Sequence, residues 1–141
     1  MRVIELDALD AKILSIMKED ARIPFTEIAK KLDLSEGAVR QRVKNLMESG
    51  IIKKFTVETA ENHPRALVFI STSPRVPVPT IAKNIAALDG VDSVMEVAGQ
   101  FDIGVVVSGQ DVSSVNGCID LMREVEGVQT TNTLFVLRKW K

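Results

Sequence analysis

The residues with the clearest chemical potential form a basic stretch at positions 40–54. Its cations are Arg40, Arg42, Lys44, Lys53 and Lys54. Glu48 is the only acid among them, so the stretch has five cations against one acid, a net charge of +4, although the 141-residue chain has a formal net charge of −1. Guanidinium groups pair with guanine edges, and ammonium groups attract phosphates. We therefore expect this surface to bind double-stranded DNA.

The basic stretch begins inside a predicted helix. Ser35 is a good N-cap for this helix, and Gly50 supplies the left-handed residue that ends it. At about 100° per residue, one face is apolar; its members are Val39, Val43, Leu46 and Met47. The opposite face consists of Gly37, Gln41 and Lys44, flanked by Arg40 and Asn45. Gln41 and Arg40 suit base edges, Lys44 suits phosphate, and Gly37 permits close approach to DNA.

Two predicted helices precede this one. Asp7 caps the first, which ends near Asp20, and the second spans about 26–32, followed by a turn at 33–34. This layout is typical of a helix-turn-helix, whose second helix enters the major groove. Residues 51–57 favour β structure and are predicted to form a small wing. The predicted DNA-binding residues are Ser35, Glu36, Gly37, Arg40, Gln41, Arg42, Lys44, Asn45, Lys53 and Lys54.

Two other interpretations of the first half remain open. Its three helices also fit a plain bundle with a solvated charged face, or a domain that binds protein within a metabolite-sensing oligomeric module. A short helix, a turn, a serine cap, a glycine stop and a local charge surplus occur together, and this combination favours DNA binding.

Few residues support other kinds of chemistry. Cys118 and His63 are the only members of their types, which argues against a disulfide or a zinc site within one chain. The sequence has no glycine-rich phosphate loop and no motif that pairs a nucleophile with a base. No apolar run is long enough for a membrane helix. We expect a cytoplasmic protein that is not an enzyme and has neither a metal nor a cofactor.

The second half changes to β-rich segments. Strands are predicted at 66–72, 91–97, 101–108 and 130–137, with helices at 80–88 and 112–125. The motifs L-D-G-V at 88–91 and V-E-G-V at 125–128 form a weak internal repeat. The order βαββαβ indicates a ferredoxin-like α+β domain with both helices on one face of the sheet. Because its strands are apolar on both faces, we expect the other face to pack on a second copy of the chain.

The domain boundary is predicted where periodicity is lost. Residues 58–65 read E-T-A-E-N-H-P-R, so we place a DNA-binding domain at 1–57, a linker at 58–65 and a second domain at 66–141. The alternative boundary is the proline-rich run at 73–79, which fits better as the loop that enters the next helix.

Nearly the whole chain resembles the leucine-responsive regulatory protein and AsnC (Lrp/AsnC) family of transcription regulators. The matching segments are L-D-A-L-D-A-K-I-L at 6–14, E-D-A-R-I-P-F-T-E-I-A at 19–29, L-S-E-G-A-V-R-Q-R-V-K-N-L at 34–46, G-I-I at 50–52 and G-Q-F-D at 99–102. The resemblance implies a winged helix-turn-helix followed by a RAM/ACT-like regulatory domain, an amino-acid effector, and homodimers or octamers of four dimers. Arg42 matches the family's recognition-helix arginine; its position beside the core face leaves open a phosphate contact or a structural ion pair.

The resemblance also implies an effector site, at Gly99, Gln100, Phe101, Asp102, Thr131 and Thr133. An α-amino acid carries an ammonium and a carboxylate, so its site needs acceptors beside donors. Asp102 and the two threonines supply both. The alternative is that Gly99 only forms a hairpin turn and the threonines only suit a strand. Glu96 would suit a basic effector such as lysine, or is simply an exposed strand residue.

Overall fold

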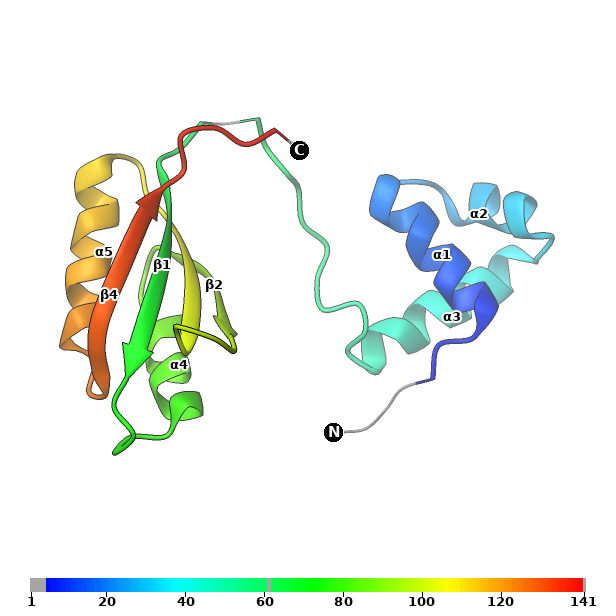
Figure 1. Ribbon diagram of the computed structural model, residues 1–141. Coiled ribbons are helices and arrows are strands. Elements are labelled where there is room, and N and C mark those ends of the chain that lie inside the picture. Colours follow the sequence, from blue (N-terminus) through cyan, green and yellow to red (C-terminus); the bar gives the residue numbers. More distant parts are fainter. Residues whose placement is uncertain (1–4, 61, 141) are drawn as a thin grey trace. The chain divides into compact units, whose positions relative to one another are not determined.

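The computed structural model describes residues 5–60 and 62–140, and the chain divides into two compact units between residues 59 and 60. Each unit has its own apolar cluster. Figure 1 labels the helices of both units and most of the strands of the second.

The first unit consists of α1 (Ala8–Glu19), α2 (Phe25–Leu32) and α3 (Glu36–Glu48). The expected caps are present: the Asp7 carboxylate accepts from the Asp10 amide at 2.7 Å, and the Ser35 hydroxyl accepts from the Ala38 amide at 3.1 Å. Gly50, two residues beyond α3, has a φ of 77°, as a left-handed stop requires. The local signals therefore placed all three helices correctly.

The helices of this unit share one core. Its buried members are Ile13, Met17, Ile28, Ala29, Val39 and Val43. Met47, which the helical wheel assigned to the same face, is instead 49% exposed, whereas the other three members of that face, Val39, Val43 and Leu46, are buried. The prediction that Met47 belongs to the core is wrong.

The segment after α3 differs from the sequence prediction. Residues 51–60 contain no strand, so the β structure expected over 51–57 is not formed. Every other element of the unit is a helix, and a lone extended segment has no strand with which to pair. Ile52 is held by a 2.9 Å bond from its amide to the Leu46 carbonyl and packs on the core, whereas Lys53 and Lys54 are exposed.

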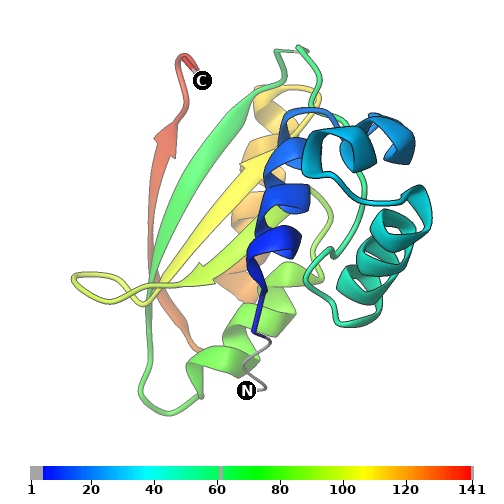
Figure 2. The same ribbon diagram turned by 90° about the vertical axis from the view of Figure 1, so that its right-hand side faces the viewer.

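The second unit is the expected βαββαβ domain. Its elements are β1 (Arg65–Thr72), α4 (Val78–Ala86), β2 (Val91–Glu96), β3 (Ile103–Ser108), α5 (Val112–Glu124) and β4 (Val128–Phe135). The sheet is antiparallel with strand order β2-β3-β1-β4, and both helices cover one face (Figure 2). Several elements begin or end one or two residues away from their predicted positions; β1 already starts at Arg65, inside the segment assigned to the linker.

One face of the sheet is covered by helices, and the other is not. Alternate residues of β1 and β3, such as Val68 and Val105, are buried under Ile81 and Ile85 of α4 and under α5. On the opposite face, Leu67 lies between Val106 of β3 and Leu134 of β4 in the strand register. Leu67 is 37% exposed and Leu134 is 53% exposed. One face is thus a closed core, and the other is an open apolar surface within this chain.

Candidate nucleic-acid interface and ligand site

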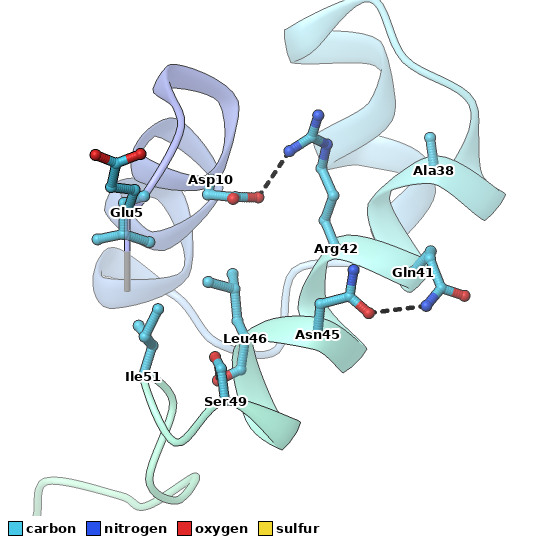
Figure 3. A pocket seen from close by; sticks show the side chains of 10 residues that line it. Glu5, Asp10, Ala38, Gln41, Arg42, Asn45, Leu46, Ser49 and Ile51 are labelled. Carbon is cyan, nitrogen blue, oxygen red and sulfur yellow. Dashed lines mark hydrogen bonds and ion pairs between the residues drawn. The ribbon is translucent and has the colours of Figure 1, made fainter. Parts of the chain in front are cut away.

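The outward face of α3 is accessible. Gly37, Gln41 and Lys44 are all exposed, and a Cβ added at Gly37 would meet nothing within 4 Å. The amide of Gln41 donates to the Asn45 side-chain oxygen at 2.9 Å (Figure 3). This bond leaves the Gln41 oxygen and the Asn45 amide nitrogen available, an acceptor and a donor of the kind that adenine edges recognise.

The beginning of α3 is held by its own side chains. The Ser35 hydroxyl is used as the cap, and Glu36 forms an ion pair with Arg40. The Arg40 guanidinium also lies 5.3 Å from the centre of the Phe25 ring, while its side chain remains 64% exposed. Arg40 is therefore oriented towards α2 and still open to a partner.

Arg42 lies in a different environment from the other cations of α3. Its Nη1 donates to Asp10 at 2.9 Å and to Asp7 at 2.5 Å, and the side chain is only 29% exposed. The bonds to Asp7 and Asp10 raise the pKa of Arg42. The pKa of Asp7 is lowered, first by the backbone amide of Asp10 and then by Arg42. Of the two roles left open by the sequence, the contacts match the ion pair.

The predicted effector residues 99–102 lie in the loop between β2 and β3. Gly99 has a φ of 138°, a conformation that favours glycine, within the loop that joins the antiparallel strands β2 and β3. The Asp102 carboxylate accepts from both the amide and the hydroxyl of Thr72, at 2.7 and 3.0 Å. The ring of Phe101 lies 5.4 Å from that of Phe69. Asp102 is thus already used to tie the loop to the end of β1.

The two threonines lie elsewhere, on the helix-covered side of β4. Thr131 accepts a 3.1 Å bond from Arg123 of α5. The Thr133 hydroxyl oxygen is buried and has no hydrogen-bond partner among the described residues. Thr133 is one of the residues that line a hollow of about 330 Å³, together with Asn116, Ile119, Asp120, Arg123 and Phe135. An orphaned polar atom beside a polar hollow is what a hydrogen-bonding ligand would satisfy.

A single chain does not bring the predicted effector residues together. Strand β1 lies between β3, which follows the loop, and β4, which carries the threonines. The sequence interpretation also missed three polar residues that line the hollow, Asn116, Asp120 and Arg123. Their spacing of four and three residues places them on one stripe of α5, a signal that the sequence already contained.

Two family models match the chain. One describes a winged helix-turn-helix DNA-binding domain and matches residues 6–53; the other describes the Lrp/AsnC ligand-binding domain and matches residues 65–141. The chain belongs to the Lrp/AsnC family. Members of this family are DNA-binding transcription regulators, not enzymes, and the second domain is the one that binds a small-molecule ligand.

Individual Lrp/AsnC proteins are similar over nearly their full length. The HTH-type transcriptional regulator LysM of Saccharolobus solfataricus is 46% identical over 136 residues, covering 96% of each chain. Escherichia coli AsnC has the same fold, with a TM-score of 0.77 and 22% identity over 96% of this chain and 95% of that one. A Neisseria meningitidis regulator solved as an L-Met complex has a TM-score of 0.79 and 22% identity over 97% and 93% of the two chains.

Within the described ranges 5–60 and 62–140, no helix is long and apolar enough to cross a membrane. Over the same ranges, no group of three or more acidic, histidine or cysteine side chains is placed to hold a metal ion.

Proposed function

We propose that this Lrp/AsnC regulator binds specific promoter sequences in the cytoplasm through the outward face of α3 and responds to an amino acid. The observation that supports the DNA interface most directly is the face itself. The helix is capped by Ser35. Its outward face is exposed and presents Gln41, Lys44 and Asn45 together. Lys53 and Lys54 extend the positive charge beyond the helix, towards the phosphate backbone.

The first test separates base readout from phosphate attraction. Replacing Gln41 with alanine should relax the preference at one base position by roughly 1 to 3 kcal/mol. Replacing Lys44 with alanine should weaken all sequences alike and lower the salt slope by about 1. Both effects are measured by fluorescence anisotropy on duplexes selected from random DNA. Lys83→Ala, at an exposed position of α4, is the control and should change neither quantity. Parental binding by both α3 variants would point to a protein partner instead.

We further propose that the chain acts as a symmetric dimer. Two copies joined through the open face of the sheet would present two α3 helices, which calls for half-sites about 10 bp apart or a multiple of that distance. An octamer of four such dimers is the larger assembly implied by the family.

For the effector we propose the hollow between α5 and β4, completed by loop 99–102 of another copy. Such an arrangement would unite two sets of residues that are separated within one chain. Lysine is our first candidate, because Asp120 and the exposed Glu96 supply carboxylates for an ammonium group.

A thermal-shift screen of the standard amino acids tests the effector proposal. A ligand at a hundredfold its dissociation constant should stabilise the parent by about 2.7 kcal/mol. Thr133→Val keeps the shape of the side chain but removes the orphaned hydroxyl, so this variant should be about 1 kcal/mol more stable without ligand and should lose much of the shift. No shift with any amino acid would show that the effector, if there is one, is another kind of molecule.

A further inference from the structure

Arg42 belongs to α3 but does not share the outward face of that helix. Consecutive residues of a helix are rotated by about 100°, so Arg42 points about 100° away from Gln41, to the side of α3 that faces the beginning of α1. Figure 3 shows its guanidinium extended towards Asp10, in the wall of a hollow of about 510 Å³ that Gln41 and Asn45 also line. Two carboxylates share its Nη1 nitrogen.

The charge around Arg42 disfavours a phosphate. Asp7 and Asp10 together carry two negative charges against its single positive charge, and Glu5 lines the same hollow. A DNA phosphate that approached the guanidinium would meet this excess of carboxylate and would have to displace a bond that already exists. One of the two partners is well shielded for a surface group, since the Asp10 side chain is only 19% exposed, whereas that of Asp7 is 52% exposed. The other two cations of α3 each pair with a single carboxylate, Arg40 with Glu36 and Lys44 with Glu48.

The three residues connect parts of the unit that are far apart in sequence. Asp7 uses one carboxylate oxygen to cap α1 and the other to accept from Arg42, so a continuous set of hydrogen bonds joins the first turn of α1 to the middle of α3. The two helices also pack through the apolar cluster that contains Ile13, Val39 and Val43. Apolar contact stabilises without specifying a direction, whereas the shared guanidinium specifies both distance and angle.

We infer that Arg42 is a positioning residue for DNA binding: with Asp7 and Asp10 it fixes the orientation of α3 against α1, and it does not itself contact DNA. This inference rests on the proposed DNA interface, because the orientation matters only if α3 enters the groove. The inference means that the negatively charged Asp10 is needed for binding DNA, although its charge alone would weaken binding to a polyanion.

The decisive experiment measures the affinity of the full chain for a duplex that the parent selects from random DNA, at several salt concentrations. Asp10→Asn removes a negative charge, so simple electrostatics predicts tighter binding; we expect roughly tenfold weaker binding, at an unchanged salt slope. Arg42→Lys keeps the charge but not the shared geometry and should show the same loss. Glu19→Gln, at an exposed acid of the same helix, is the matched control and should bind at least as well as the parent.

The exchange Asp10→Arg with Arg42→Asp should restore much of the affinity, and circular dichroism verifies that each variant keeps its helices. Arg42→Gln removes the charge; a salt slope lowered by about 1 in this variant, as expected for Lys44→Ala, would show that Arg42 contacts phosphate and would overturn the inference alone. Parental or tighter binding by Asp10→Asn would overturn it as well. If the parent selects no duplex, the proposed function fails first, and the inference fails with it.

Discussion

Replacing Leu67 with glutamate is expected to convert the proposed dimer to a monomer and to weaken operator binding by roughly 100-fold or more. Leu67 lies at the middle of the open sheet face, flanked in the register by Val106 and Leu134. In a symmetric dimer the substitution occurs twice, so two apolar contacts are lost and two like charges are placed in a desolvated interface. A monomer would bind a single half-site and lose the advantage of a tethered second one.

The control for this experiment is Leu121→Glu. Leu121 is 48% exposed on α5, compared with 37% for Leu67 on the sheet, so the two substitutions make a similar chemical change at surfaces of similar exposure. Analytical ultracentrifugation should show a monomer for Leu67→Glu and the parental assembly for Leu121→Glu. A dimer that survives Leu67→Glu would mean that the copies join elsewhere. Monomers from both variants would mean that the helix face also takes part.

The parts of the fold that the sequence predicted best are those decided within a few residues. Asp7 and Ser35 each cap a helix through the amide three residues later, and Gly50 ends a helix because of its own backbone freedom. Such interactions depend on local spacing, which a sequence displays directly. The strands of the second unit were also found, since their β-branched residues and the turn glycines repeat in order.

The parts that could not be predicted depend on partners distant in the chain. The helical wheel gave the direction of Arg42, but its carboxylate partners lie 32 and 35 residues earlier. The orphaned hydroxyl of Thr133 follows from how β4 packs against α5, which no local pattern specifies. The strand expected at 51–57 is absent for a related reason: β propensity creates a strand only where another strand is available to pair with it.

Glycine at position 127 is expected to be indispensable for the second unit, and Gly127→Ala should destabilise it by about 2 to 5 kcal/mol. Two costs combine in this estimate. The backbone φ of 97° is strained for any residue with a Cβ, and the added Cβ would lie 2.6 Å from the Ile81 Cδ1 and 2.9 Å from the Val76 Cβ. The Ile81 methyl belongs to a flexible side chain, but the Val76 Cβ is fixed to the backbone of the loop before α4.

Gly117→Ala provides the matched control, because it makes the same chemical change within the same unit at a site of opposite character. Gly117 lies inside α5, and a Cβ there would meet nothing within 4 Å, so alanine should stabilise the unit by about 1 kcal/mol through helix propensity. Urea unfolding followed by circular dichroism, at equal protein concentrations, measures both changes. Equal stability of the two variants would mean that the loop around position 127 relaxes freely, and the close packing of Val76 and Ile81 on this glycine would then contribute little to the fold.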